Sequence, residues 1–450
     1  MVALLFRKLG LATPFLLLLL SVDLFAQPNQ NSPYSRYGLG DLLPQYFTHH
    51  AGMGGLTTAY HDPHQLTVQN PASLAFLRTA TFETGFYTNY SNYRSDDGKF
   101  NDWSGNLSYL ALGFTLRSPI NEALDKVQSP WRWGMGFSLA PYTLIGYNIF
   151  SNDTLPDLGA YTSAFEGDGG TSRFAWGTAL RYKETSVGVN LGWVYGQAYQ
   201  DNTTSITDSF PTFQTHLNTD YRINGFVWSL GVQHDHVLKY AENDEAQPNK
   251  WVTFGLTASS NHPLTIKADQ FYLRSRGEFS EGIYLNPDTL LYEEGSRQSL
   301  KLPAMVSLGV MLVQLNKYRL GMQYDFGNWQ AYENELKPES LRNTHGISVG
   351  AEYIRDNASY NRYLNRVRLR GGAYFRQDSR VVNGDQLTDF GGSIGFGFPI
   401  VLPRLQTSYL NTSLEVGHLG AGTPIRETYF RLTVGFCLND NSWFYKRRFE

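Results

Sequence analysis

One group of residues has the types and spacing that metal binding requires. Four of the ten histidines, His49, His50, His61 and His64, fall within sixteen residues. Imidazole rings bind zinc or copper, and the His61-x-x-His64 spacing brings two rings together on a turn or helix. Because no clear third and fourth ligand accompanies them, the favoured interpretation is that they make polar contacts within the fold. No metal and no other cofactor is expected.

A second pattern has the spacing of a nucleophilic serine. The segment 391–395 reads Gly-Gly-Ser-Ile-Gly and matches the G-x-S-x-G motif of hydrolases. That motif needs a strand, a strained turn and a helix, whereas Ile394, Phe396 and Phe398 continue to alternate as a strand. Ser393 is therefore predicted to be a strand residue, and the chain is not expected to be an enzyme.

Charged residues on the polar face of several predicted strands form a third group: Arg319, Asp325, Glu352, Arg368 and Arg370. Arginine suits bidentate recognition of a ligand carboxylate. Equally, these side chains could pair with one another, because charge inside a fold must be compensated. Mutual pairing is the favoured interpretation.

The elements that would position these residues are strands with two different faces. In 430–438 the residues Phe430, Leu432, Val434, Phe436 and Leu438 alternate with small or polar residues, so they would point one way. The stretches 187–196 and 318–327 repeat the pattern. A soluble sandwich turns its apolar face inward, whereas a membrane barrel turns it toward lipid and encloses a polar lumen. The pattern alone fits either fold.

The N-terminus and the composition favour the membrane barrel. Arg7 and Lys8 precede an apolar run to Leu20, and a cleavage point is expected after Ala26, so residues 1–26 are predicted to be a cleaved secretory signal peptide. No later run approaches the roughly 18 apolar residues of a spanning helix, and the mean hydropathy is −0.34. The 29 tyrosines suit the aromatic girdles of an outer-membrane barrel.

The net charge limits the classes of partner that the chain can bind, and the cysteine content limits its covalent cross-links. A net charge of −3 favours neither nucleic acid nor a strongly charged partner. Cys437 is the only cysteine, so no intramolecular disulfide can form. The expected surroundings are the lipids of a Gram-negative outer membrane.

Alternation and turn signals together predict an all-β protein, a transmembrane antiparallel β-barrel of about 14 strands. Long outer loops are expected at 148–170, 205–212, 279–297 and 330–342, and short turns near 183–185, 314–317 and 399–404. Asn261-His262-Pro263 could split the stretch 250–278, which we treat as one bulged strand. The predicted strands are 80–92, 104–117, 131–147, 171–184, 185–204, 213–238, 250–278, 298–315, 316–329, 343–357, 364–377, 388–401, 404–417 and 426–438.

The chain is thereby divided into four regions. Residues 1–26 are the signal peptide, 80–438 the barrel and 439–450 a periplasmic tail. Residues 27–79 do not alternate and carry many Gly, Pro, His and Asn residues. A barrel of this size needs its interior filled, so this segment is predicted to be a plug.

The plug region carries a family resemblance. Gly52, Gly54 and Gly55, followed by Asp62 and by Asn70-Pro71-Ala72 in the segment 70–75, resemble the N-terminal signature of the long-chain fatty-acid transporter family, FadL. Leu302-Pro303, at the start of a strand that runs into Gly309, extends the match. The two ends of the chain, 32–41 and 443–448, look like relatives from Bacteroidetes-type bacteria, a branch that also includes barrel subunits of a protein secretion machine.

The resemblance implies passive uptake of hydrophobic, fatty-acid-like molecules through a plugged lumen, with a sideways exit at a kinked third strand. Pro141 lies in the middle of that strand and cannot donate a ladder hydrogen bond. It is the candidate for a lateral opening, with a simple bulge as the alternative. Gly52, Gly54, Gly55, Asn70, Pro71 and Ala72 are the other ligand or gate candidates. The alternative function is a non-transporting barrel that is a subunit or scaffold of an envelope protein-secretion or assembly complex.

Overall fold

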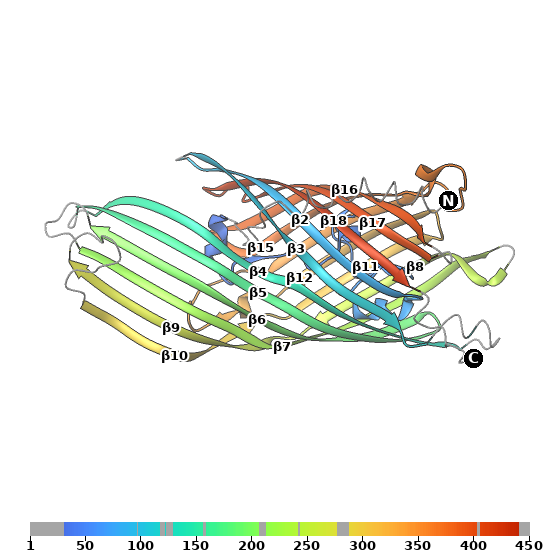
Figure 1. Cartoon of the computed structure of the whole chain (residues 1–450), viewed down its shortest axis with the longest axis horizontal. Coiled ribbons are helices and arrows are strands. Elements are labelled where there is room, and N and C mark those ends of the chain that lie inside the picture. Colours follow the sequence, from blue (N-terminus) through green and yellow to red (C-terminus); the bar gives the residue numbers. More distant parts are fainter. Residues whose placement is uncertain are drawn as a thin grey trace, which may run out of the picture.

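The computed structural model of the chain is a closed, antiparallel β-barrel with almost no helix (Figure 1). It describes residues 31–96, 98–117, 122, 129–155, 159–206, 213–241, 244–276, 288–402 and 406–440. The signal peptide predicted at 1–26 and residues 441–450 of the predicted tail lie outside this part. Among the described residues no helix is both long and apolar enough to cross a membrane.

The strands of the wall begin at the predicted starts or a few residues from them in most cases. They are β2 (Ala80–Arg94), β3 (Lys99–Thr115), β4 (Trp131–Leu155), β5 (Gly159–Tyr182), β6 (Thr185–Ile206), β7 (Phe213–Ala241), β8 (Asp244–Ser259), β9 (His262–Arg276), β10 (Asp288–Leu302), β11 (Met305–Gln314), β12 (Tyr318–Gly327), β14 (Thr344–Ile354), β15 (Arg368–Val382), β16 (Asp385–Leu402), β17 (Gln406–Leu419) and β18 (Arg426–Asp440).

Two of the fourteen spans of the wall are interrupted, and the interruptions face each other. β8 and β9 both pair with β7 and form one span, as predicted for 250–278. β10 and β11 likewise form one span opposite them. The breaks at 260–261 and 303–304 do not reverse the chain, so the number of spans stays even. Fourteen spans are confirmed.

The first and last strands close the barrel. β18 pairs with β2 from Arg426↔Arg94 to Asp440↔Ala80 without a register shift. Asn439 and Asp440 therefore belong to the wall, and the prediction that the tail begins at 439 is wrong by two residues. Because both ends of the wall lie at the same end of the barrel, we call this the periplasmic end and the opposite one the outer end.

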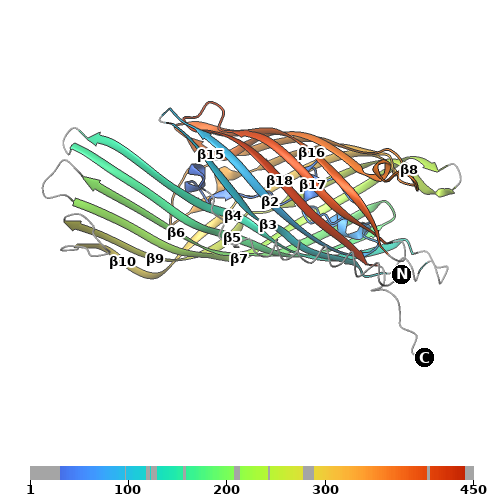
Figure 2. The same ribbon diagram turned by 45° about the horizontal axis from the view of Figure 1, so that its top comes forward.

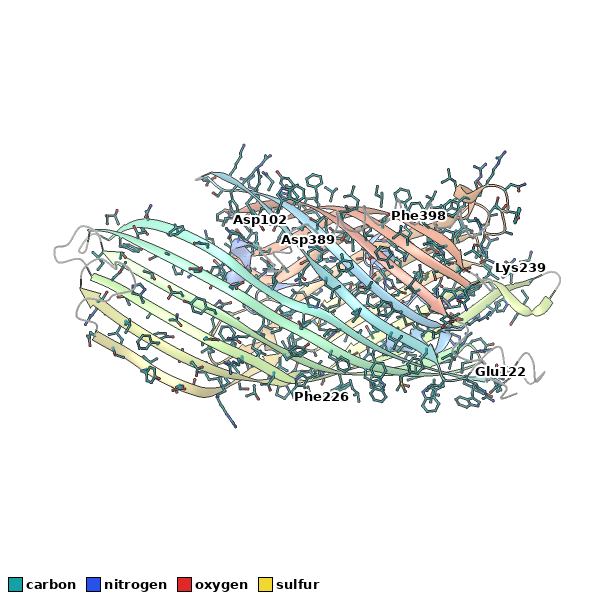
Figure 3. The ribbon with its side chains drawn as sticks, in the orientation of Figure 1. Asp102, Glu122, Phe226, Lys239, Asp389 and Phe398 are labelled. Carbon is teal, nitrogen blue, oxygen red and sulfur yellow. The ribbon has the colours of Figure 1, made fainter. Side chains whose placement is uncertain are left out.

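The two faces of the wall differ as the alternation predicts. On β18, Phe430 and Leu432 are 44% and 45% exposed on the outside, whereas Thr433 and Cys437 are buried toward the lumen. Figure 3 shows side chains such as Phe226 and Phe398 on the outer surface of the wall. The wall therefore presents an apolar band to its surroundings, as a membrane-spanning barrel does.

The outer end of the wall is much taller on one side. β12 has 10 residues, enough for one membrane crossing, whereas β7 has 29 and extends roughly 95 Å. β4 to β7, β9 and β10 rise together as a sheet beyond the other strands (Figures 1 and 2). In the outer loops predicted at 148–170 and 279–297, residues 148–155, 159–170 and 288–297 are strand, so those predictions are wrong there, and residues 156–158 and 279–287 lie outside the described part. Above the apolar band this sheet carries charges on its outer face, among them Glu166, Arg222 and Lys267.

Residues 31–79, which we call the N-terminal segment, lie inside the barrel. The segment contains four short elements, η1 (Pro33–Arg36), β1 (Asp41–Leu42), α2 (Thr48–Ala51) and η2 (Pro71–Phe76). Its apolar side chains pack against the wall: Leu39 joins residues of β4, β7 and β9 near the outer end, and Met53 and Leu56 join Met311 and Val313 of β11.

Three further short elements lie near the two mouths. η3 (Trp329–Ala331) and β13 (Glu333–Asn334) belong to the loop 328–343, which folds inward so that Trp329 and Tyr332 join the cluster around Leu39. η4 (Tyr363–Arg366) lies at the periplasmic end. The part of the lumen beneath the raised sheet is therefore filled by the N-terminal segment and this loop.

Candidate functional site

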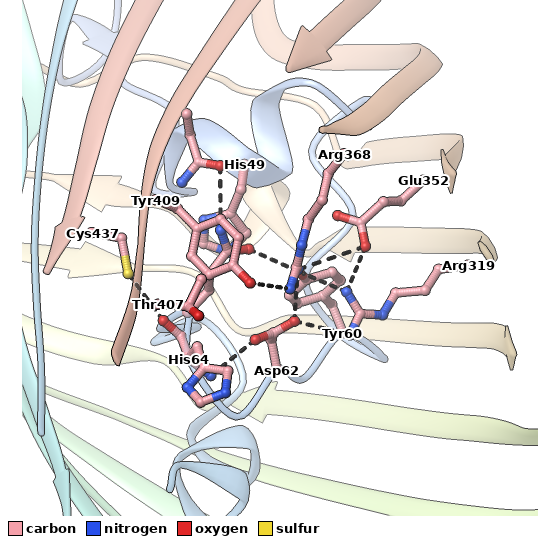
Figure 4. A network of polar contacts seen from close by, with 12 residues as sticks. His49, Tyr60, Asp62, His64, Arg319, Glu352, Arg368, Thr407, Tyr409 and Cys437 are labelled. Atoms are coloured by element: carbon pink, nitrogen blue, oxygen red, sulfur yellow. Dashed lines mark hydrogen bonds and ion pairs between the residues drawn. The ribbon is translucent and has the colours of Figure 1, made fainter. Parts of the chain in front are cut away.

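Four of the five predicted lumen charges meet in one buried network with Asp62 of the N-terminal segment (Figure 4). Arg319 bonds Asp62 Oδ2 at 2.9 Å and Glu352 Oε1 at 2.6 Å. Arg368 bonds Asp62 Oδ2 at 2.8 Å, and Arg370 bonds Glu352 Oε2 at 2.8 Å. Asp62 and Glu352 are almost fully buried. The arginines thus pair with carboxylates of the protein itself.

Neutral side chains complete the network. Arg368 donates to the Tyr409 hydroxyl at 2.9 Å, and Arg370 donates to Asn411 Oδ1 at 2.8 Å and to Gln65 Oε1 at 3.3 Å. Burial alone would raise the pKa of Asp62, but Arg368 and Arg319 hold it well below its usual range. The Asp62 carboxylate is therefore ionised and fixed at every physiological pH.

Asp325 lies apart from this network. It accepts two bonds from Gln323 Nε2, at 2.9 and 3.1 Å, and Gln323 Oε1 in turn accepts from the backbone N–H groups of Thr57 and Thr58 at 2.8 and 2.9 Å. The Asp325–Gln323 pair therefore holds a turn of the N-terminal segment against β12.

The glycines of the family signature lie where the segment contacts the wall. Gly54 and Gly55 have φ values of +69° and +85°, which favour glycine. A methyl group at Gly52 would lie 2.9 Å from Gly395 Cα of β16. Gly54 N donates to Ser393 Oγ at 2.9 Å. Ser393, the serine of the hydrolase-like pattern, thus lies within β16 and binds the segment's backbone.

The Asn70-Pro71-Ala72 motif makes a second backbone contact. Asn70 caps η2, because its Oδ1 accepts from Ala72 N at 3.1 Å while its Nδ2 donates to Thr58 O at 2.6 Å. A methyl group at Gly188 of β6 would lie 2.6 Å from Pro71 C. Wall glycines thus admit the backbone of the segment. Other wall glycines that a methyl group would push into the segment include Gly113, Gly134, Gly177, Gly231, Gly255, Gly309, Gly321, Gly350, Gly372, Gly395 and Gly435.

The four clustered histidines do not converge. His49 and His50 have ring centroids 3.9 Å apart, and His50 Nε2 lies 3.0 Å from Thr67 Oγ1. His61 binds Asp235 Oδ1 at 3.0 Å, and His64 donates its backbone N–H to Asp62 Oδ1 at 2.9 Å. Within the described ranges, no three His, Cys, Asp or Glu side chains lie together as metal ligands would. Burial, with repulsion from Arg370 next, lowers the pKa of His50 to about 3.

Pro141 lies where the wall changes partners. β3 and β4 form only six pairs, from Leu110↔Leu139 to Thr115↔Gly134. Beyond Leu139 the edge of β4 bonds the N-terminal segment instead: Gln45 Nε2 donates to Pro141 O at 2.8 Å, and β1 pairs with 143–144. A cavity of about 30 Å³ lies there, lined by Pro141, Leu107 and Leu43 among others. The two strands part at this height, and residues 41–45 fill the edge of β4.

Sequence reasoning predicted pairing among the lumen charges, which Glu352 provides, but it did not identify Asp62 as the partner of Arg319 and Arg368. Residues 27–79 contain only two acidic residues, Asp41 and Asp62, and both bind inward-facing arginines: Asp41 binds Arg380 of β15, and Asp62 binds Arg319 and Arg368. The small number of acidic residues in this region was the signal from which the partner could have been predicted. A carboxylate in a segment predicted to lie within a barrel is the natural partner for arginines on the lumen face.

The comparisons with known proteins agree with this architecture. The family model described as BamG matches residues 7–450. Similar solved structures include the toluene transporter TbuX of Ralstonia pickettii, with 12% identity, a TM-score of 0.54, and coverage of 88% of this chain and 99% of that one. A FadL homologue of Pseudomonas aeruginosa has 13% identity, a TM-score of 0.56, and coverage of 88% and 98%.

The toluene transporter TodX of Pseudomonas putida has 14% identity and a TM-score of 0.52, with coverage of 90% of this chain and 100% of that one. No curated protein matches the chain. Identities this low establish the fold alone. The chain has the fold of the FadL-type outer-membrane barrels, and it belongs to the BamG family.

Proposed function

We propose that this protein is a non-transporting barrel of a Gram-negative outer membrane that acts as a subunit or scaffold of an envelope protein complex. The observation that supports this most strongly is the fit of the N-terminal segment in the lumen. Its backbone lies against wall glycines from β4 around to β16, at distances that leave no room for a methyl group. We infer that the segment is a fixed plug.

The cavities support a closed lumen. Three cavities with mainly apolar or mixed walls have volumes of about 230, 90 and 30 Å³. Sites for drug-sized ligands measure roughly 300–1,000 Å³. None of the three accommodates a long acyl chain without movement of the segment.

The cost of such movement supports the same conclusion. Displacing the segment would separate Asp62 from Arg319 and Arg368, and breaking a buried ion pair costs about 3–5 kcal/mol. Arg380, which bonds Asp41 and the backbone oxygen of Tyr34, would lose partners as well. A gate that opens for each passing molecule would be expected to have weaker contacts than these.

The raised sheet offers a surface for partners. Its strands extend far beyond one membrane crossing, and above the apolar band their outward faces carry charged residues together with exposed apolar ones such as Phe271 and Tyr292. A transporter needs no such one-sided wall, whereas a scaffold can use it to contact another envelope protein.

Mass spectrometry of the protein extracted in detergent tests the proposal. One sample is measured in the native state and a second after organic extraction. We expect stoichiometric envelope proteins in the first and no stoichiometric apolar molecule in the second. An apolar ligand at one copy per barrel, with no associated protein, would refute the scaffold function.

The parting of β3 and β4 favours a second candidate, passive uptake of hydrophobic molecules with lateral exit near Pro141. The six-pair ladder and the cavity beside Leu107 support it. Replacement of Pro141 by Val restores a backbone donor and should slow uptake of a fluorescent fatty acid by vesicles that contain the barrel. Unchanged uptake would remove Pro141 from any such route.

A further inference from the structure

A polar cavity of about 340 Å³ lies at the periplasmic end of the lumen. Its inner wall is the ion network, with Asp62, Arg368 and Tyr409 among the lining residues. The rest of its wall comes from separate parts of the chain: Arg78 just before β2, the turn 314–317, residues 357 and 366 at or near η4, and residues of β16 and β17. The N-terminal segment closes it toward the outer end.

This cavity has more positive than negative charge. Five basic side chains line it, Arg78, Lys317, Arg319, Arg366 and Arg368, against the two carboxylates of Asp62 and Glu352. Both carboxylates already bind arginines within the network. Three cations, those of Arg78, Lys317 and Arg366, therefore remain for another partner.

The described part of the chain supplies no carboxylate to these three cations. No ion pair joins Arg78, Lys317 or Arg366 to any described Asp or Glu. The Nε of Arg366 is buried without a hydrogen-bond partner, and its guanidinium lies 5.3 Å from the ring centre of Tyr363. A buried donor without an acceptor is destabilising, so a bound oxyanion would stabilise this arrangement.

We propose that this cavity binds an acidic peptide segment of a periplasmic protein, whose carboxylates pair with Arg78, Lys317 and Arg366. The inference rests on the scaffold function, because it states the chemistry of one partner. It adds a binding site at the periplasmic mouth.

The shape and position of the cavity favour a peptide. Lipid headgroups lie outside the wall, whereas this cavity faces the lumen. Its cations come from separate segments, which suits several carboxylates along one chain better than a single small ion. Between them lie Trp251, Val313 and Val401, which can contact apolar side chains of the same peptide. Because the cavity is closed at its inner end, it accepts a short segment or a chain end.

Fluorescence anisotropy with labelled hexaglutamate tests the proposal on the full-length protein in detergent. We expect the binding to weaken as the salt concentration rises to about 0.5 M, which is well above physiological ionic strength, because salt screens charge pairs near solvent. Hexaglutamine should not bind. The double variant Arg78→Gln, Lys317→Gln should lose about tenfold or more in affinity, because it removes two of the three cations that have no carboxylate partner in the cavity.

Lys239→Gln provides the matched control. Lys239 is exposed at the same end of the barrel (Figure 3) but does not line the cavity, so this variant should bind hexaglutamate as the wild type does. Absence of hexaglutamate binding, equal binding of hexaglutamine, or an equal loss in the Lys239 variant would overturn the proposal.

The partner measurement separates this inference from the function on which it rests. If envelope proteins co-purify equally with the wild type and the double variant, and hexaglutamate does not bind, the cavity proposal fails while the scaffold function stands. If hexaglutamate binds through Arg78 and Lys317 but no envelope protein co-purifies, the anion site stands and the scaffold function fails.

Discussion

Replacement of Asp62 by Ala should loosen the N-terminal segment while the barrel stays closed. The Asp62 carboxylate binds Arg319 and Arg368 and also holds the His64 turn through the His64 N–H. The His64 carbonyl in turn accepts from Cys437 Sγ at 3.0 Å and from Asn439 Nδ2 at 3.0 Å. Loss of Asp62 therefore frees the turn that covers the only cysteine.

The magnitude follows from the burial of the network. Asp62 is 2% exposed, and its removal leaves three arginines with Glu352 as their only carboxylate. Removing one partner of a buried ion pair costs about 3–5 kcal/mol. At about 1.4 kcal/mol per factor of ten, the population with an undocked segment should rise about a hundred- to several-thousand-fold.

The assay is the rate at which a maleimide labels Cys437 in the folded protein. Cys437 is fully buried, so labelling reports opening of the segment, and heat-dependent gel mobility confirms that the barrel is intact. Asp288→Ala is the control: its pair with Arg274 is exposed, and exposed pairs contribute little, so the rate should change by no more than a few-fold. A rate for Asp62→Ala within a few-fold of the wild type would refute the idea that the network fixes the segment.

Three further outcomes are expected. Gly188→Ala should lower thermal stability by about 1–3 kcal/mol, because its new methyl group meets the Pro71 backbone; Gly371→Ala, whose nearest atom would be 3.9 Å away, should have little effect on the same melting curve. Lowering the pH from 7 to 5 should remove about 2 kcal/mol of the stability that His50 contributes, because a pKa near 3 in the folded state, against about 6.5 when unfolded, gives stability that is complete above pH 6.5 and declines as the pH falls; the difference in melting temperature between the wild type and His50→Gln should therefore change between these pH values, and an unchanged difference would exclude His50. Ser393→Ala should lose only the bond from Gly54 N and so label at Cys437 slightly faster, whereas loss of a hydrolytic activity would contradict its role as a strand residue.

The alternation of apolar and polar residues predicted the strands of the wall well, because a membrane-spanning strand must alternate in this way. Residues in contact with lipid must be apolar and those facing the lumen need not be, so a strand such as 426–440 reads clearly. Above the membrane that constraint disappears. The segment 159–170 is rich in glycine and polar residues and reads as a loop, yet it forms the outer half of β5. The alternation of apolar and polar residues therefore could not predict how far the raised sheet extends.

The ion network was predictable only in part. The inward direction of Arg319, Glu352, Arg368 and Arg370 followed from their strand positions. The partner that Arg319 and Arg368 share, Asp62, lies 257 residues before Arg319 and 306 before Arg368. No periodicity links residues so far apart, so their meeting depends on how the segment folds inside the barrel, which strand patterns do not encode.

The closure of the wall has a consequence for the order of assembly. The seam between β2 and β18 joins the first and last strands by fifteen unbroken pairs from Ala80 to Arg94, and the inner face of β18 binds the N-terminal segment through Cys437 and Asn439. A segment so closely fitted cannot be threaded into a finished ring. We therefore expect the segment to lie against the growing sheet before β18 pairs with β2, so that the barrel closes around it.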